Sequence, residues 1–508
     1  MKLSRSSMLY GTMLLTGTSL VAQVVGFVYR IFLSRLVGAE IMGLYQLIMP
    51  VYSVLMSVTA VGLTVAVSTL SSEYHARGGA EAMLPVLRRC LAAFLILFAL
   101  AAAVVAVWYD PISVRLLGDA RTQLGLLLLL PCILLTGIEN LHKHFFYGAG
   151  LVRPPAAVEL CEQFIRTGAV LGLLVFFLPQ NPERTVGLIV TGMVICEVFS
   201  AVTLTILYRR HTAGLPRRAA PPGLNRRIFS IAVPIGLTSL LGNLMGSANA
   251  VLIPQRLVAS GADVSQAMSA FGVLCGMTVP MLCMPTAFIG AMGLMLVPRL
   301  AQLSALGRGD AIRGHIHRAM LATSVLIMPS MALLTVLGPT IGRFLFREET
   351  AGDFIVPLSV GVLLSCYQSV LSGVLNGMGR QRAAAWNAIV CGAVQLWCTW
   401  FLMGLPGVGL RGYVAGFVAS SALGAVLNWR QVARRARMRP RLFQWCTAPV
   451  LASLLMGLVV NLLFRVLLDA GADGAAAALA CLAFGTVLYL AALLAQGVPV
   501  RELFHMGG

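Results

Sequence analysis

The sequence predicts an all-α integral membrane protein with about 14 transmembrane helices. These form two six-helix lobes followed by two C-terminal helices. The first observation is composition: 58% of the 508 residues are hydrophobic, only 11% are charged, and the mean hydropathy is +0.88. A soluble chain of this length would need more polar surface to cover its core. The second is the recurrence of apolar runs of about 20 residues, the length that spans the ~30 Å apolar layer of a bilayer.

A third observation, an internal duplication, predicts the two lobes. The stretch TSLVAQVVGFVYRIFLSRLVGAE (18–40) returns in similar form as TSLLGNLMGSANAVLIPQRLVASGAD (238–263). Both are apolar segments with a basic exit, and both lead into a second long apolar segment. We therefore interpret the chain as two copies of one ancestral unit.

The duplication extends further along the chain. At an offset of 229 residues, LLTGIENLHKHFFYGAGLVR (134–153) aligns with LLSCYQSVLSGVLNGMGRQR (363–382), and Arg166 aligns with Gln395. Six spans per copy is an even number, so the copies have the same orientation. Parallel repeats imply a pseudo-two-fold axis along the membrane normal, and we expect the solute site between the halves, near mid-membrane.

The predicted elements in chain order define four regions. Residues 1–208 form the N-terminal six-helix lobe, 209–227 a cytoplasmic linker rich in proline and arginine, 228–435 the C-terminal six-helix lobe, and 436–508 two extra spans and a tail. The expected spans are about 8–33, 43–70, 86–108, 123–147, 156–178, 185–208, 228–257, 267–303, 316–338, 354–378, 383–404, 409–429, 445–468 and 475–496.

The placement of basic residues predicts the orientation. With both termini in the cytoplasm, 26 of the 37 basic residues fall in or beside inner segments and 10 in or beside outer segments, and Arg166, deep within a span, is counted with neither. This is the positive-inside pattern of a multi-pass protein of the cell membrane. The net charge of +19 is therefore assigned to topology, and no nucleic-acid partner is expected.

Motifs for cofactor chemistry do not appear. Most of the eleven cysteines lie in or at the ends of apolar segments, without metal-ligand spacing. The sequence contains no Walker A, GxSxG or HExxH motif. We expect a transporter with no cofactor, no metal and no catalytic residues, not an enzyme.

Charged residues within spans are costly, so each is a functional candidate. Glu162 and Arg166 lie four residues apart in the fifth span and share a helix face, with Arg166 about 15 Å into the membrane. Glu197 in the next antiparallel span lies at a similar depth. A pair of Arg166 with Glu162 or Glu197 is expected, either as a bridge between helices or as part of the cavity lining and ion coupling.

Arg30, in the outer half of the first span, is a candidate for binding an anionic phosphate. The alternative is an arginine that extends toward the membrane interface. Glu139 with Lys143 is a candidate proton relay or a solvated loop edge. The amides Asn243 and Asn249 are candidates for binding a sugar or a cation, with packing between helices as the alternative. The amides that replace Glu139 and Arg166 in the second copy, Gln368 and Gln395, complete the candidate cavity lining.

Several stretches together resemble the stage V sporulation protein B family. They are GFVYRIFLSRLVGAEIMGLYQLIMPVY (26–52), TAVGLTVAVSTLSSEYHARG (59–78), FGVLCGMTVPMLCMPTAFIGAMGLMLVPRL (271–300) and LSGVLNGMGRQR (371–382). The resemblance covers roughly residues 1–435. That family belongs to the multidrug/oligosaccharidyl-lipid/polysaccharide exporter superfamily.

The resemblance implies two six-helix lobes, alternating access and a lipid-linked oligosaccharide as the cargo. It suggests an undecaprenyl-linked peptidoglycan precursor, with a role in the spore cortex. The expected partners are this cargo lipid and membrane lipids, and the expected state is a monomer. Two alternatives stay open: a multidrug or cation antiporter on the same fold, and a non-transporting membrane scaffold that binds cell-wall synthases.

Overall fold

The computed structural model describes residues 8–76, 81, 83–177, 181–214, 220–438, 441 and 443–498. Residues 215–219 of the predicted linker and 499–508 of the predicted tail lie outside these ranges. Within them the chain is almost entirely helical and contains no strand. It divides into two compact units: unit 1 comprises residues 1–255 and 263–272, and unit 2 comprises residues 256–262 and 273–508.

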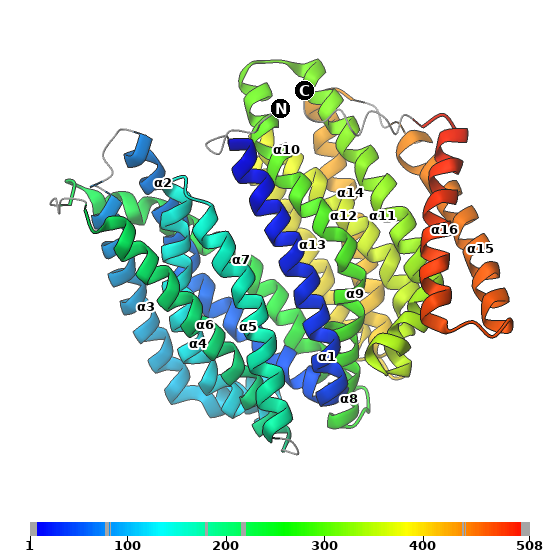
Figure 1. The fold of residues 1–508 in the computed structure, drawn as a ribbon, viewed down its shortest axis with the longest axis horizontal. Coiled ribbons are helices and arrows are strands. Elements are labelled where there is room, and N and C mark those ends of the chain that lie inside the picture. Colours follow the sequence, from blue (N-terminus) through cyan, green and yellow to red (C-terminus); the bar gives the residue numbers. More distant parts are fainter. Residues whose placement is uncertain are drawn as a thin grey trace. The chain divides into compact units, whose positions relative to one another are not determined.

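The elements of the first half follow the predicted order. They are α1 (Met8–Met56), η1 (Ser57–Val61), α2 (Gly62–Ala76), α3 (Met83–Pro111), η3 (Ile112–Leu117), η4 (Ala120–Thr122), α4 (Gln123–Gly148), α5 (Arg153–Phe177), α6 (Pro182–Thr212), α7 (Leu224–Ala259) and α8 (Val264–Phe271). Figure 1 labels the α-helices among them.

The second half contains the repeat and the two extra spans. Its elements are η5 (Gly272–Thr278), α9 (Val279–Cys283), η6 (Met284–Thr286), α10 (Ala287–Ala305), α11 (Gly309–Phe346), η7 (Glu349–Gly352), α12 (Ile355–Gly377), α13 (Gln381–Leu402), α14 (Leu410–Ala436), η8 (Phe443–Thr447), α15 (Ala448–Asp469) and α16 (Gly474–Ala495). The predicted boundary at 209–227 separates the two copies of the sequence repeat. The compact units divide at other residues, because α7 packs with unit 1 as far as Gln255, so the predicted boundary stays a prediction.

The number of spans agrees with the prediction. In the described part of the chain, 13 helical stretches are long and apolar enough to cross a membrane. The first of them, Gly17–Ala76, has 60 residues, which at 1.5 Å per residue is about 90 Å and too long for one crossing. Its helix is interrupted at Gly38, where φ is 79° and ψ is 176°, a conformation open to glycine. This stretch holds two spans, so the all-α fold with about 14 spans is confirmed.

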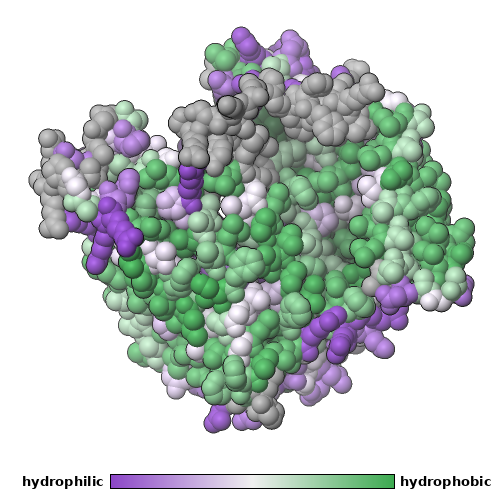
Figure 2. Space-filling model, viewed as in Figure 1, coloured by the Kyte–Doolittle hydropathy of each residue, from purple (hydrophilic) through white to green (hydrophobic). Residues whose placement is uncertain are grey.

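The surface of the helices is that of a membrane protein. Large hydrophobic side chains are exposed along most spans, among them Ile96, Phe176, Trp386, Leu458 and Val487. Figure 2 shows hydrophobic residues along the lengths of the helices and hydrophilic residues gathered near their ends. This pattern satisfies a hydrocarbon solvent at the helix sides and water at the loops.

In unit 1, α6 packs against both α4 and α5, and α5 also packs against α1. Glycine permits the closest of these contacts. A Cβ built on Gly192 of α6 would lie 2.8 Å from the Cα of Val170 on α5. The backbones of α5 and α6 therefore approach closely at the depth where both helices carry charged residues.

Unit 2 repeats this packing with the helices that the duplication predicts. There α14 packs against both α12 and α13, as α6 does against α4 and α5. The offset of 229 residues places α4 on α12 and α5 on α13. The extra helices α15 and α16 pack against each other and against α11.

Candidate functional site

A buried cluster of charged residues lies in unit 1, where α4, α5 and α6 meet. Its centre is the guanidinium of Arg166. The Nη2 atom forms ion pairs with Glu162 on its own helix and with Glu197 on α6, the latter at 3.2 Å, and the Nε atom donates to the Sγ atom of Cys196 at 3.3 Å. The sequence left open which acid pairs with Arg166; in the structure both do.

Lys143 forms a second centre of positive charge. Its Nζ atom lies 3.0 Å from the Oε1 atom of Glu139, one turn earlier on α4, and 3.9 Å from the Oε2 atom of Glu159 on α5. Glu139 is 2% exposed, so the interpretation of this pair as a solvated loop edge is wrong. The reason is that α2, α3 and α6 pack along α4, which sequence spacing within one helix does not reveal.

The negative charge of Glu139 also repels those of Glu162 and Glu197, so the two centres belong to one electrostatic system. Four carboxyl groups share two cationic groups. Glu162 is 5% exposed and Glu197 is 3% exposed, and among the described residues the Oε2 atom of Glu197 has no hydrogen-bond partner. Buried carboxylates that outnumber the cations beside them are costly in a low-dielectric interior. The cluster is therefore suited to holding protons or attracting a cation.

The ligand atoms of Glu162, Cys196 and Glu197 lie within 4.8 Å of one another, a spacing that suits a metal ion. The guanidinium of Arg166 bonds to these same three side chains and already supplies a positive charge there. The geometry favours a protein cation over a metal at this position.

The candidate amides of α7 have different surroundings. Asn243 donates from Nδ2 to the Oγ atom of Ser57 in η1 at 2.6 Å and lies 3.4 Å from the Oγ atom of Ser239. It thus links α7 to the π-helical segment of the second span. Asn249 donates to the carbonyl oxygen of Met245 on its own helix at 3.5 Å.

Arg30 lies on α1, within the first span, and is half-buried. Among the described residues, no side chain or carbonyl forms a hydrogen bond or ion pair with its guanidinium. The structure therefore does not bond Arg30 to the cluster of Arg166, and its role as a phosphate ligand stays a prediction.

In unit 2, the repeat positions carry neutral groups. Gln395, the counterpart of Arg166, accepts a hydrogen bond through Oε1 from Ser420 on α14 at 2.8 Å, and its Nε2 atom has no partner within the described ranges. Beside Gln368, the counterpart of Glu139, Asn428 donates from Nδ2 to the backbone oxygen of that residue at 3.0 Å and accepts from Asn387 at 2.8 Å. At these positions an ion pair joins α5 to α6 in the first repeat. Hydrogen bonds of amide side chains join α13 to α14 in the second repeat.

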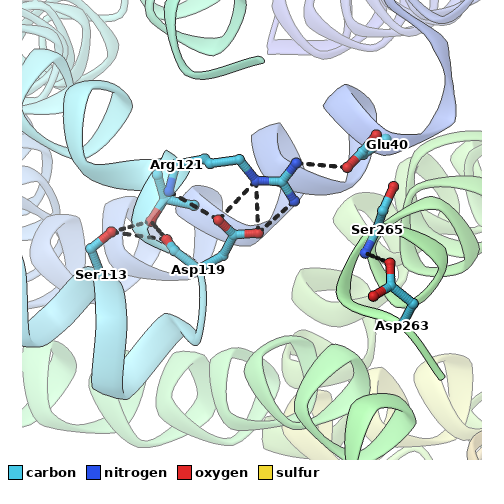
Figure 3. Close-up of polar contacts among 7 residues, drawn as sticks. Glu40, Ser113, Asp119, Arg121, Asp263 and Ser265 are labelled. Atoms are coloured by element: carbon cyan, nitrogen blue, oxygen red, sulfur yellow. Dashed lines mark hydrogen bonds and ion pairs between the residues drawn. The ribbon is translucent and has the colours of Figure 1, made fainter. Parts of the chain in front are cut away.

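Sequence reasoning missed Asn387 and Asn428, although both are amides within predicted spans. It also missed a network in unit 1 that joins α1 to the turn before α4 (Figure 3). There Arg121 bonds through Nη1 to Glu40 at 2.6 Å and through Nη2 to Asp119 at 2.7 Å. Asp119 also caps the turn before α4 by accepting from the backbone N–H of Arg121. A charged triplet whose members lie 81 residues apart, on α1 and at η4, has no local sequence signal.

Comparison with known proteins agrees with these features. The family model described as "Polysaccharide biosynthesis protein" matches residues 8–304. The chain is 23% identical over 438 residues to stage V sporulation protein B of Bacillus subtilis, covering 85% of each chain. It is 22% identical over 450 residues to the lipid II flippase MurJ of the same organism, covering 83% of this chain and 81% of that protein. The resemblance expected from the sequence is confirmed.

Solved structures share the fold. A lipid II flippase MurJ in an inward closed conformation aligns with a TM-score of 0.68 and 13% identity, covering 97% of this chain and 100% of that chain. An inward-facing multidrug resistance transporter of the MATE family, of the MOP superfamily, aligns with a TM-score of 0.64 and 16% identity, covering 82% of this chain and 94% of that chain. At such identities the likeness concerns the fold.

Proposed function

Since this chain belongs to the polysaccharide biosynthesis protein family, we propose that it is a flippase for an undecaprenyl-linked saccharide. The family match over most of a multi-pass membrane chain is the observation that carries this proposal. Two relatives matched over 85% and 81% of their length support it, one of them named as a lipid II flippase. A peptidoglycan precursor, with use in the spore cortex, is the cargo that the names of these relatives favour.

The physical task explains why such a cargo needs a protein. A pyrophosphate-linked sugar cannot enter hydrocarbon unaided, because the loss of hydration of its charges costs tens of kcal/mol in the absence of partners. Polar and cationic groups within the spans replace that hydration. Arg30 is the proposed phosphate ligand, since its guanidinium has no protein partner among the described residues and can bind two phosphate oxygens.

Alternating access is the proposed mechanism, because the chain consists of two like-oriented repeats. Both termini are proposed to face the cytoplasm, as the distribution of basic residues indicates. With a negative interior, outward movement of an anion is favoured by about 2.3 kcal/mol per charge per 100 mV. The membrane potential is therefore one proposed energy source.

Proton exchange at the cluster of Arg166 is the second proposed energy source. Two carboxyl groups in excess of the cations favour the uptake of protons when the cluster is closed to water. Glu197 is the preferred exchange group, since one of its oxygens is unpaired in the interior. Glu162 and Glu139 share the charge that a departing proton leaves behind.

A test is complementation of a bacterium whose own flippase for lipid-linked cell-wall precursors can be depleted. We expect the wild-type chain to restore growth and the Arg30→Ala variant to fail at equal membrane abundance. The control Arg115→Ala removes an exposed arginine at the end of a span and should restore growth fully. Absence of rescue by the wild type across several such hosts would count against the proposed cargo class.

A cation or multidrug antiporter is the second candidate function, and the excess of acids in the cluster of Arg166 favours it. An antiporter binds a cationic solute and exchanges it for protons. It would drive efflux of a cationic dye from vesicles under a proton gradient, whereas the proposed flippase would not. Loss of dye efflux in Glu197→Gln would support the antiporter.

A further inference from the structure

A polar pocket lies within unit 2, among α10, α12, α13 and α14, with a volume of about 430 Å³. This volume is within the ~300–1,000 Å³ range of ligand pockets. Its α12 wall carries hydroxyl or amide side chains at Ser365, Gln368, Ser369, Ser372 and Asn376. Spacings of three, four, seven and eleven residues place them along one face of the helix.

Most of this polar face has no protein partner. Ser365 donates its hydroxyl to the carbonyl oxygen of Val362 at 2.8 Å. In the described part of the chain, the side chains of Gln368, Ser369, Ser372 and Asn376 form no hydrogen bond. Polar side chains within membrane spans are normally bonded to a neighbouring helix, since hydrocarbon offers no alternative. Four unbonded side chains in a row indicate a face that a polar ligand covers.

The chemistry of the pocket does not suit a charged ligand. None of its lining residues carries a charge, so it offers a phosphate no cation and an ammonium group no anion. Its polar groups are amides and hydroxyls, which both donate and accept hydrogen bonds. Sugar hydroxyls and acetamido groups present the same mixture of donors and acceptors.

Small residues on the facing wall leave room for a ring. A Cβ built on Gly290 or Gly293 of α10 would meet no atom within 4 Å. Ala384 and Ala388 line the side formed by α13. A neutral ring that carries hydroxyl groups can therefore approach the polar face of α12 closely.

We propose that this pocket binds the saccharide of the lipid-linked cargo. The inference rests on the proposed flippase function and adds the place in the chain where the sugar is held. It also explains the difference between the repeats. Glu139 in unit 1 belongs to a charged cluster, whereas Gln368, its counterpart, lines a neutral pocket.

The test is a binding measurement on the purified full chain in lipid nanodiscs. One probe is undecaprenyl pyrophosphate that carries a disaccharide of N-acetylhexosamines, and the other is undecaprenyl pyrophosphate alone. We expect the wild type to bind the sugar-bearing lipid at least 10-fold more tightly. The Ser372→Ala/Asn376→Ala double variant should lose about 5- to 100-fold of that affinity, the effect of two lost hydrogen bonds, and bind the sugar-free lipid unchanged.

Two further variants separate binding from folding. Gly293→Leu fills the pocket from the opposite wall, where the structure has space, and should have the same selective effect as the double variant. Ser359→Ala on the outer half of α12 removes a hydroxyl bonded to the carbonyl oxygen of Ile355 and should bind both lipids as the wild type does. All variants should keep the unfolding midpoint of the wild type within a few degrees.

Equal affinity of the wild type for the two lipids would overturn the pocket assignment and leave the flippase function standing. An equal loss of affinity for both lipids in the double variant would overturn it too. So would an affinity that depends on the sodium concentration and not on the presence of the sugar. Failure of the wild type to bind either lipid would overturn the proposed function, and the pocket assignment with it.

Discussion

Replacement of Arg166 by methionine tests the buried cluster most severely. The variant keeps an unbranched apolar side chain but removes the cation that pairs with Glu162 and Glu197. Both carboxyl groups are at most 5% exposed, so water does not replace the guanidinium. Removal of one partner from a buried ion pair costs about 3–5 kcal/mol. We expect a lower unfolding midpoint near pH 7 and a smaller loss at acidic pH, where both acids take up protons.

The cysteines provide the assay. Cys90 and Cys132 are buried and react with a thiol-specific fluorescent dye only when the helices separate, whereas Cys161 and Cys283 are exposed and set the baseline. Heating the purified chain in detergent with this dye gives an apparent unfolding midpoint for each variant.

Two comparisons make the result decisive. The exposed Arg115→Met variant loses a charge at the end of a span without a described partner, and should change stability by less than about 0.5 kcal/mol. The triple variant Arg166→Met/Glu162→Gln/Glu197→Gln leaves no unpaired charge and should recover most of the lost stability. A midpoint for Arg166→Met that equals that of Arg115→Met would refute the reasoning.

Three further substitutions test other contacts by the same assay. Gly192→Leu should lower the midpoint, because an added Cβ would lie 2.5 Å from a valine methyl group of α5. The control Gly172→Leu should not lower it, because a Cβ there would meet no atom within 4 Å. Equal midpoints of the two variants would contradict the close packing of α5 and α6. Arg121→Ala should cost about 1 kcal/mol, and high salt should reduce the difference; no salt dependence would argue against the ion pairs. Asn428→Leu should cost about 1–3 kcal/mol, since it leaves the buried Nδ2 atom of Asn387 without its acceptor, and a neutral effect would disprove the need for that bond.

The spans could be predicted because hydropathy and length decide them directly. The predicted span 123–147 and the helix α4 differ by one residue, and the predicted span 354–378 differs from α12 by one residue at each end. The sequence predicted only that the first two spans are separated somewhere between residues 33 and 43, and the structure places the kink at Gly38. Helix ends that extend into water, such as the first turns of α11, exceed the predicted apolar span because their polar residues do not follow the apolar pattern.

The site could be predicted in part. Spacing on one helix indicated the pair of Glu162 and Arg166. The similar depth of Glu197 in the next span indicated that it lies near them. The inclusion of Lys143 depends on how α4 and α5 are rotated about their axes, which a single sequence does not encode in an obvious way. The neutral pocket of unit 2 was indicated only by Gln368, because serine in a membrane span is common and carries little signal alone.

The proposed function is tested most directly by reconstitution. Purified chain in vesicles is given undecaprenyl pyrophosphate that carries a fluorescent disaccharide, and a membrane-impermeant quencher reports how much of the lipid changes leaflet. We expect rapid transfer with the wild type, transfer at the rate of empty vesicles with Arg30→Ala, and acceleration by a potential that is negative on the side the lipid leaves. Transfer by the wild type no faster than in empty vesicles would contradict the account.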